Sequence, residues 1–370
     1  MTTTQALWFG LALAAVLGLL WWLARRGARG DRRRVGSAPA TQYASTNYAE
    51  TQVAEAGDTV VDLALAVAPG RRLGHFRIER DLARGAMGMV MLGVDERSGQ
   101  PIALKTMALG REFHGQALLD ARARFFREAE MAGRLQHPDI VRVLDAGEEG
   151  GLAYIAMELL RGHDLSRHAQ PATLLPAAQV VATLARVADA LDFAHRQGVI
   201  HRDIKPANIM VDPAHDSVKV TDFGIAHIAD ATQTRTGLVL GTPSFMSPEQ
   251  MAGERVDGRS DLYSLGVTLY QLLTGRLPFE GVSMAALVRA IASEPPPDLR
   301  ELRPDLPASL AEVVTLALQK RPETRYASGR DFAADLRAVL REIKAAAPVE
   351  SRESGSVPTA AQPPAPGQNR

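Results

Sequence analysis

The sequence predicts an α+β domain with two lobes, a small β-rich lobe followed by a larger α-helical lobe. Apolar and polar side chains alternate at the two-residue period of strands through residues 74–108. After residue 176, four long segments repeat apolar residues at the period of an amphipathic helix instead. With 370 residues, 46% of them hydrophobic, the chain can bury a sizeable core. Chains divided in this way commonly bind a ligand between the lobes.

The expected elements follow one another along a continuous domain at residues 73–343. The small lobe, 73–157, should hold strands at 74–85, 88–96, 101–108, 140–149 and 152–160, with a helix at 117–136 before the last two. The large lobe, 161–343, should hold helices at 177–198, 259–275, 308–320 and 329–343. The connection between the lobes then falls near residues 158–160.

Overall composition excludes several classes of function. The chain has 42 basic and 42 acidic residues, so its formal net charge is zero and nothing in the total favours a nucleic-acid partner. Cysteine is absent, which excludes disulfides, thiolate metal sites and cysteine nucleophiles.

Residues 6–24 carry no charged side chain and, as a helix, would cover roughly 28 Å, about the hydrocarbon thickness of a bilayer. Six arginines follow within ten residues, so the positive-inside rule places residues 1–5 outside and the rest in the cytoplasm. We therefore expect a single transmembrane helix. The alternatives are a cleaved signal peptide, which lacks here a basic first region and a cleavage site, and a buried helix.

The segments that flank the domain have the composition of a tether and a tail. Residues 25–72 are rich in Ala, Gly, Ser, Thr and Arg and show weak periodicity, which indicates a juxtamembrane linker. Residues 344–370 form a Pro/Ala/Ser-rich stretch that we expect to be disordered. Thr46, Thr51 and Thr59 in the linker are weaker candidates for phosphorylation that would dock a phosphothreonine-reading partner.

The segment VIHRDIKPANIM, residues 199–210, places an acid, a base and an amide within six positions of one another. Asp203 can accept a hydroxyl proton, and Lys205 can neutralise charge on a moving phosphoryl group. Asn208 and Asp222 offer oxygen atoms of the kind that bind Mg²⁺, and Gly224 after Asp222 permits unusual backbone angles. This set of groups suits in-line phosphoryl transfer.

HRDIKPAN and DFG, with 14 positions from Asn208 to Asp222, resemble the catalytic and metal-binding loops of eukaryotic-like (Hanks-type) serine/threonine protein kinases of bacteria. The resemblance covers residues 73–343. It implies the bilobal protein kinase fold, ATP as the phosphate donor, Mg²⁺ with Mn²⁺ as an alternative metal, and protein substrates with Ser or Thr acceptors. Lys205, two residues after Asp203, resembles the Ser/Thr branch rather than the tyrosine branch.

The resemblance also assigns a lysine and a glutamate that position the phosphates. Lys105 in PIALKTM matches the lysine that binds the α- and β-phosphates, and its expected partner is a glutamate of the following helix. Glu128 is favoured because it shares a helix face with Ala132 and Leu135, whereas Glu130 is rotated by about 200° from it.

The nucleotide-covering loop departs from the pattern of the family. ARGAMGMV has Ala83 where the first glycine of G-x-G-x-x-G usually stands, while Gly85 and Gly88 are retained. Because phosphates approach the backbone closely there, we expect the added methyl group to weaken or reshape nucleotide contact. The remaining residues assigned to the nucleotide site are apolar or lie in the connection between the lobes: Val90, Ala103, Met157 as gatekeeper, Glu158 and Leu160.

Residues 225–250 resemble the activation and substrate-docking segments. Thr234 and Thr236 match paired activation-loop threonines, and Arg202 could bind a phosphate placed on one of them. The alternative is that these hydroxyls lie on a loop that no enzyme modifies. Thr242 would contact Asp203 and Lys205 and favour a Ser or Thr acceptor.

Five further residues are assigned structural roles by the same resemblance. Glu249 and Arg325 are the expected buried ion pair, and Asp261 is the acid that ties the catalytic loop to a core helix. His201 and Phe223 are expected to pack in the core, although a histidine beside an aspartate can also serve as a proton relay.

Two hypotheses of function remain from the sequence. The first is an active kinase anchored in the bacterial cytoplasmic membrane, which phosphorylates its own activation loop between two copies of the chain. The second is a pseudokinase or docking scaffold that keeps the fold and signals by binding. Lys105, Glu128, Asp203, Asn208 and Asp222 are all present and favour the enzyme, while Ala83 favours the scaffold.

Overall fold

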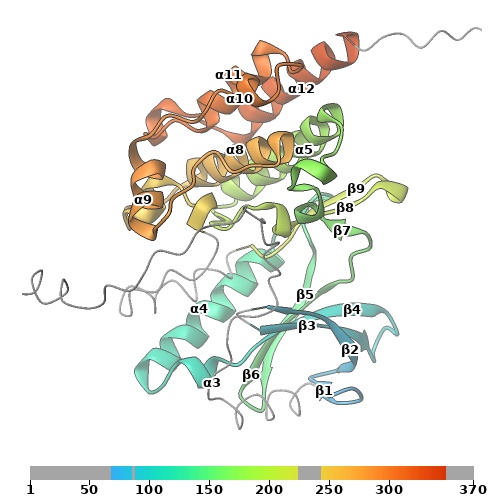
Figure 1. The fold of residues 1–370 in the computed structure, drawn as a ribbon. Helices are drawn as coiled ribbons and strands as arrows, with labels where there is room; N and C mark the ends of the chain where they lie inside the picture. Colours follow the sequence, from blue (N-terminus) through green and yellow to red (C-terminus); the bar gives the residue numbers. More distant parts are fainter. Residues whose placement is uncertain (1–67, 86–87, 224–242, 347–370) are drawn as a thin grey trace, which may run out of the picture. The chain divides into compact units, whose positions relative to one another are not determined.

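The computed structural model describes residues 68–85, 88–223 and 243–346, which all belong to one compact unit (Figure 1). Within these ranges no helix is both long and apolar enough to cross a membrane. The predicted transmembrane helix at 6–24, the linker up to residue 67 and the tail from residue 347 lie outside the described residues.

The small lobe is a six-stranded antiparallel sheet with the strand order β1-β2-β3-β4-β6-β5. Its strands are β1 (Arg72–Leu73), β2 (Phe76–Gly85), β3 (Gly88–Asp95), β4 (Pro101–Met107), β5 (Val143–Glu149) and β6 (Leu152–Glu158). Helices α3 (Leu109–Glu112) and α4 (Gln116–Gly133) lie between β4 and β5 in sequence. Alternate residues of β4 enter different apolar clusters, Leu104 on one face and Ala103 with α4 on the other.

The large lobe is mostly helical and carries a three-stranded sheet, β7 (His163–Asp164), β8 (Ile209–Asp212) and β9 (Ser217–Val220). Its helices are α5 (Ala177–Arg196), α7 (Pro248–Met251), α8 (Gly258–Thr274), α9 (Met284–Ser293), α10 (Leu299–Leu302), α11 (Ala308–Ala317) and α12 (Gly329–Ala346). Short 3₁₀ turns include η1 (Leu165–His168) and η3 (Pro206–Asn208). Because β8 follows η3 directly, the small sheet supports the segment that the sequence marks as catalytic.

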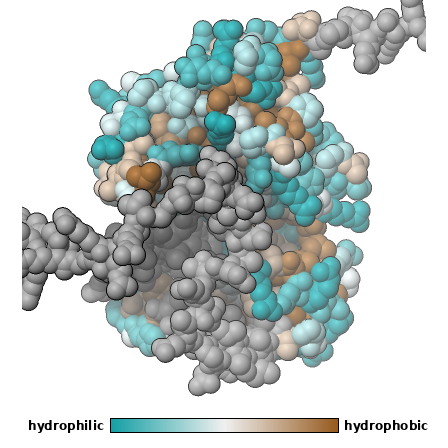
Figure 2. Space-filling view, viewed as in Figure 1, coloured by the Kyte–Doolittle hydropathy of each residue, from teal (hydrophilic) through white to brown (hydrophobic). Residues whose placement is uncertain are grey.

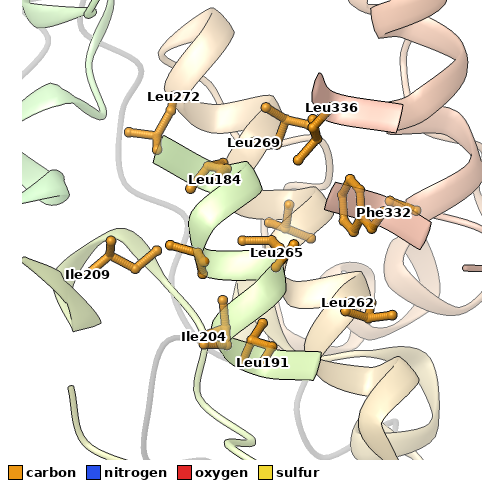
Figure 3. Packing of buried hydrophobic residues seen from close by; sticks show 14 of the residues in the cluster. Leu184, Leu191, Ile204, Ile209, Leu262, Leu265, Leu269, Leu272, Phe332 and Leu336 are labelled. Carbon is orange, nitrogen blue, oxygen red and sulfur yellow. The ribbon is translucent and has the colours of Figure 1, made fainter. Parts of the chain in front are cut away.

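Helix α8 is the centre of the large lobe, since 14 of its 17 residues are buried. Figure 3 shows Leu262, Leu265 and Leu269 of α8 packed among side chains of α5 and α12. Full burial of a leucine or phenylalanine contributes about 1.5–3 kcal/mol. A helix surrounded in this way is a rigid support for any polar group that it carries.

The predicted strands and long helices are present, and their boundaries differ by a few residues. The helix expected at 117–136 ends at Gly133, and the strand expected at 140–149 begins at Val143. Helices α9 and α10 were not predicted; the four residues of α10 are too few for the helical period to show. Their capping residues, Ser283 and Asp298, were the available signals.

The visible face of the described part is mostly hydrophilic, with small separated apolar areas (Figure 2). The larger exposed apolar side chains include Leu119 and Phe126 of α4 and Val282 before α9. Exposed apolar residues scattered in this way are ordinary for a folded domain.

Two buried tyrosines differ in the state of their hydroxyl groups. The Tyr263 hydroxyl is buried and has no hydrogen-bond partner among the described residues, whereas Tyr326 donates to Asp335 at 2.9 Å. A buried hydroxyl without a partner costs about 1–3 kcal/mol of desolvation, while a satisfied one contributes about 0.5–1.5 kcal/mol. We therefore expect Tyr263→Phe to leave the free energy of unfolding unchanged or raised, and Tyr326→Phe to lower it. Urea unfolding of both variants checks this, and a larger loss at position 263 would contradict it.

Candidate active site

The catalytic loop is tied to helix α8 through one buried carboxylate. Asp261, fully buried, accepts hydrogen bonds from the backbone N–H groups of His201 at 2.8 Å and Arg202 at 2.7 Å, and contacts the His195 ring at 2.7 Å. Burial alone would raise the pKa of Asp261, but these donors outweigh it and hold the pKa below its usual value. The backbone of Arg202 has a φ of 68°, a strained conformation for this residue. Asp261 thus holds the loop in a conformation that it would not adopt alone.

His201 positions Asp203 and is not placed to relay protons. Its Nε2 lies 2.7 Å from the Thr221 carbonyl, which only accepts, so Nε2 carries the hydrogen. Its Nδ1 then accepts from the backbone N–H of Asp203 at 3.2 Å. The ring is fully buried and packs 4.6 Å from the ring of Phe223. Both ring nitrogens are occupied, which agrees with the core role expected from the sequence.

The side chains of Lys205 and Asn208 both contact the carboxylate of Asp203. The Lys205 ammonium lies 2.8 and 3.0 Å from the two Asp203 carboxylate oxygens. The Asn208 amide nitrogen donates to the carboxylate of Asp203 at 3.0 Å and to its carbonyl at 2.8 Å. This orientation turns the Asn208 amide oxygen away from Asp203 and leaves it as an oxygen ligand for a cation.

Asp222 lies between this cluster and the small lobe. It has a φ of 66°, and its carboxylate pairs with the ammonium of Lys105 on β4 at 2.8 Å. Burial favours the neutral acid, but the adjacent Lys105 outweighs it and keeps the pKa of Asp222 below its usual value. The carboxylate is therefore charged at neutral pH, as a ligand for a divalent cation must be.

The expected pairing of Lys105 with Glu128 is not formed among the described residues and stays a prediction. Among the described residues Lys105 forms its ion pair with Asp222, and no ion pair joins it to Glu128. Glu128 instead lines a cavity between α4 and the catalytic loop, together with Arg202 and Phe223. Asp222 has a left-handed backbone, and its carboxylate lies 2.8 Å from the Lys105 ammonium. The rejected alternative, Glu130, is mostly exposed and pairs with Arg134.

The walls assigned to the adenine ring are apolar and adjacent in the sheet. Val90 pairs with Lys105 and Ala103 pairs with Met157 in the strand registers. Ala103 and Met157 are buried, and Val90 and Leu160 pack against the same apolar cluster. A flat apolar ligand next to Lys105 would meet these side chains.

The connection between the lobes is fastened by a residue that the sequence analysis missed. Lys219 on β9 lies 2.6 Å from the carboxylate of Glu158, which also accepts from the backbone N–H of Arg142 at 2.8 Å. The Glu158 backbone N–H donates to the Arg142 carbonyl at 3.0 Å. The only available signal was a lysine at a polar position of the strand-like run at 217–220. The Glu158 side chain thus links β9 to the segment before β5.

The positions of the nucleotide-covering loop differ in how strictly the backbone requires glycine. Gly88 has a φ of 151°, and a Cβ there would lie 1.7 Å from the Thr106 carbonyl oxygen. Ala83 pairs with Val90 in β2, is exposed, and does not have a positive φ. Gly85 pairs with Gly88, and residues 86–87 lie outside the described residues. Alanine at position 83 therefore causes no backbone strain.

We expect Gly88→Ala to destabilise the protein by at least about 1–3 kcal/mol, because β3 must move away from β4 to admit the methyl group. Affinity for nucleotide should fall with it. Gly99→Ala is the matched control, since Gly99 has a φ of 70° but no atom within 4 Å of an added Cβ. Thermal unfolding and titration with a non-hydrolysable nucleotide measure both effects. Equal losses in the two variants would refute the steric argument.

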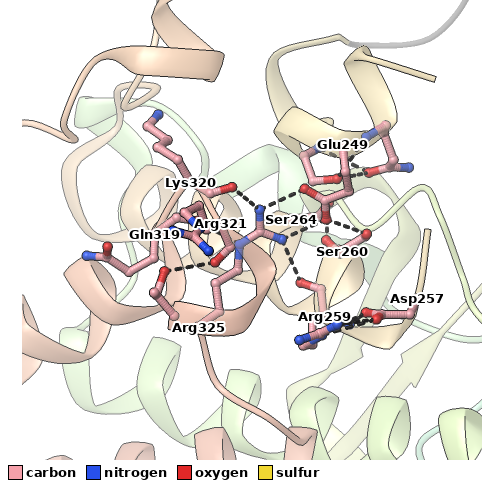
Figure 4. Close-up of polar contacts among 12 residues, drawn as sticks. Glu249, Asp257, Arg259, Ser260, Ser264, Gln319, Lys320, Arg321 and Arg325 are labelled. Carbon is pink, nitrogen blue, oxygen red and sulfur yellow. Dashed lines mark hydrogen bonds and ion pairs between the residues drawn. The ribbon is translucent and has the colours of Figure 1, made fainter. Parts of the chain in front are cut away.

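Glu249 and Arg325 form the buried ion pair expected from the sequence, shown in Figure 4. Two guanidinium nitrogens lie 2.7 Å from the two carboxylate oxygens, and the Arg325 side chain is 0% exposed. Burial alone would raise the pKa of Glu249, but the bonds from Arg325 and Ser260 hold it below its usual value. The pair joins α7 to the segment before α12.

Four of the assigned residues lie outside the described residues, namely Gly224, Thr234, Thr236 and Thr242. The linker threonines Thr46, Thr51 and Thr59 lie outside them as well. Their roles stay predictions.

Known proteins are similar in sequence to most of this chain. The family model described as protein kinase domain matches residues 76–335. The serine/threonine-protein kinase Pkn1 of Myxococcus xanthus is 40% identical over 311 residues, which are 81% of this chain and 44% of Pkn1. PknJ of Mycobacterium tuberculosis is 41% identical over 279 residues, 73% of this chain and 46% of PknJ. The chain thus spans about half the length of these curated relatives.

Solved structures show the same fold. The crystal structure of the Mycobacterium tuberculosis PknI kinase domain superimposes with a TM-score of 0.59 at 33% sequence identity. The alignment covers 74% of this chain and 99% of that domain.

Proposed function

The chain belongs to the protein kinase family, and on that premise we propose that it transfers the γ-phosphate of ATP to Ser or Thr hydroxyls of proteins. The observation that carries the proposal is the convergence of Lys205 and Asn208 on the Asp203 carboxylate, with Asp222 and Lys105 beside it. This arrangement provides a base, oxygen ligands for a cation and ammonium groups for phosphate within one site.

The transfer follows from the chemistry of these side chains. The oxygen of the acceptor hydroxyl bonds to the γ-phosphorus while the bond from that phosphorus to the bridging oxygen of ADP breaks. Asp203 accepts the hydroxyl proton, and Lys205 stabilises the negative charge on the transferred group. Asn208 and Asp222 would hold Mg²⁺, which neutralises phosphate charge when bound. Lys105 would bind the α- and β-phosphates once that cation shares the charge of Asp222.

Glu128 would then become the partner of Lys105. A divalent cation at Asp222 competes with the ammonium for the same carboxylate, which leaves Lys105 available to a second acid. Glu128 is a half-buried acid of α4 that lines the cavity between α4 and the catalytic loop.

The test is transfer of labelled γ-phosphate by the full-length chain to itself and to a generic basic protein. With Mg²⁺ we expect label on serine and threonine, and Asp222→Asn should remove it because a neutral amide replaces the charged carboxylate that binds the cation. A wild-type chain that binds ATP but transfers nothing would support the scaffold alternative. Ala83, the residue that favoured the scaffold, causes no backbone strain, and its effect on nucleotide contact stays a prediction.

Activation by phosphorylation of Thr234 or Thr236 is part of the proposal. Arg202 supports it, because its buried Nε has no hydrogen-bond partner among the described residues and could bind a phosphate. Two copies of the chain would phosphorylate each other. Phosphopeptide mapping after incubation with ATP should find these threonines modified, and the same experiment tests the linker sites Thr46, Thr51 and Thr59. Full activity of the double alanine variant would contradict the proposal.

We also propose that residues 6–24 anchor the chain in the bacterial cytoplasmic membrane, with the kinase domain in the cytoplasm. The support is the uncharged run of 19 residues followed by arginines. Fractionation of cells that express the full chain and a chain lacking residues 6–24 tests this. Recovery of both chains in the soluble fraction would refute it.

A further inference from the structure

Two histidines converge just after the connection between the lobes, away from the residues assigned to catalysis. His163 lies on β7 and His168 ends the 3₁₀ turn η1, and both side chains are half-buried and reachable from solvent. Their Nε2 atoms are 2.9 Å apart, and their ring centres are 5.1 Å apart. β7 pairs with β8 beside it (Figure 1), with His163 opposite Val211.

The Thr173 carbonyl group determines which ring nitrogen of His168 has a lone pair available for a ligand. The Nδ1 atom of His168 lies 2.9 Å from the Thr173 carbonyl oxygen, which can only accept. Nδ1 therefore carries the hydrogen, and the Nε2 lone pair points toward His163. Histidines that bind metals almost always donate their other ring N–H to a carbonyl or carboxylate in this way. The second ligand position, His163 Nε2, then donates its hydrogen to His168 when no ion is bound.

We propose that His163 and His168 chelate a divalent transition-metal ion such as Zn²⁺. With Zn–N distances of about 2.0–2.1 Å and a tetrahedral angle, two imidazole ring centres lie about 5.2 Å apart and the nitrogens about 3.3 Å apart. The ring centres already lie close to this separation, so the main change that binding needs is a reorientation of the two rings that moves the nitrogens apart. When the ion binds, His163 changes tautomer: Nε2 gives up its hydrogen and Nδ1 takes one from water, so the ring stays neutral and no net proton is released.

The ligand chemistry distinguishes this site from the one at Asn208 and Asp222. Imidazole nitrogen suits zinc, nickel and copper, while carboxylate and amide oxygens suit magnesium. The described residues contain no group of three or more His, Cys, Asp or Glu side chains arranged for a metal, so water completes the coordination. Binding should accordingly be weaker than at a structural zinc site with four protein ligands.

The position of the site gives binding a structural effect. The ion would join β7 to the end of η1, in the segment that leads from Glu158 and Leu160 into the large lobe. β7 also pairs with β8, the strand that follows Asn208. A bound ion would stiffen this connection and raise the temperature of unfolding.

The test is calorimetric titration of the untagged full-length chain with ZnCl₂, without nucleotide and with excess MgCl₂ to occupy oxygen sites. We expect one saturable site with a stoichiometry of one. His168→Ala should abolish it, and so should His163→Gln, whose amide can keep the hydrogen bond to His168 but is a poor zinc ligand. His114→Ala is the matched control, because His114 is exposed and outside the pair, and it should bind as the wild type does.

A second measurement covers the case in which an alanine variant folds poorly. Co²⁺ bound at the pair should give visible absorption bands that His163→Gln lacks, while the far-ultraviolet circular dichroism of that variant should match the wild type. Absence of saturable binding, or binding unchanged in both pair variants, would show that the two rings form only a hydrogen bond and would overturn the proposal.

Discussion

Asp203→Asn is expected to lower kcat for phosphate transfer by about 10²–10⁴-fold, the usual contribution of a positioned general base. In the structure one carboxylate oxygen of Asp203 accepts from both Lys205 and Asn208, and the other accepts from Lys205. An asparagine can keep the shared acceptor, but its amide nitrogen then faces the Lys205 ammonium, donor against donor. The variant thus loses the base and weakens the placement of Lys205 while the fold persists.

Steady-state transfer rates and the KM for ATP measure this effect. The KM should change little because the adenine walls, Ala103 and Met157, lie in the other lobe. Asp216→Asn is the matched control, since Asp216 is an exposed carboxylate with a φ of 47°, a conformation that asparagine tolerates. A loss below tenfold in Asp203→Asn would show that another group accepts the proton.

Arg325→Met should cost about 3–5 kcal/mol of the free energy of unfolding, because it leaves the Glu249 carboxylate buried without its partner. All of the guanidinium nitrogens are engaged. Besides Glu249, they donate to the backbone carbonyls of Gln319 at 2.6 Å, Lys320 at 2.8 Å and Arg259 at 3.3 Å. Arg325→Lys should therefore be destabilising too, since an ammonium has three donors and lacks the fork geometry.

Urea unfolding of the variants measures this loss. Arg321→Met is the matched control, because the Arg321 side chain is 80% exposed and its ion pair with Glu323 at 3.7 Å is at the surface. It should change the free energy of unfolding by less than about 1 kcal/mol. The double variant Glu249→Gln/Arg325→Met should be less destabilised than the sum of its single changes. Additive losses would mean that the two side chains do not interact as a pair.

Sequence order alone located most of the candidate site. Asp203, Lys205 and Asn208 lie within six residues, so they must be near one another in any fold, although Asp261 is needed to fix the conformation of the loop. The same holds for strands and helices long enough to show their period, such as β3 and α8. The sequence also indicated that position 88 needs glycine, because a side chain is poorly tolerated where a loop passes close to another group.

The partner of Lys105 was beyond the reach of sequence. Helical periodicity indicates which side of α4 faces inward, and it correctly set Glu130 apart from Glu128. Helical periodicity carries no information about Asp222, which lies 117 positions after Lys105 in the chain. Asp222 reaches the Lys105 ammonium through a left-handed backbone conformation. Lys219 was missed for a similar reason, since its bond to Glu158 joins residues of different lobes.

The sequence by itself therefore determined the fold class and the residues that stand close together along the chain, because local spacing and periodicity encode these directly. The resemblance of its motifs to those of known kinases indicated the family. Only the tertiary structure decided which distant charges pair, which imidazole nitrogens face one another, and that the backbone at Ala83 is unstrained. Ion pairs and hydrogen bonds depend on a few ångströms of separation between side chains from distant segments. That separation is set by the packing of the whole domain, which no single stretch of sequence contains.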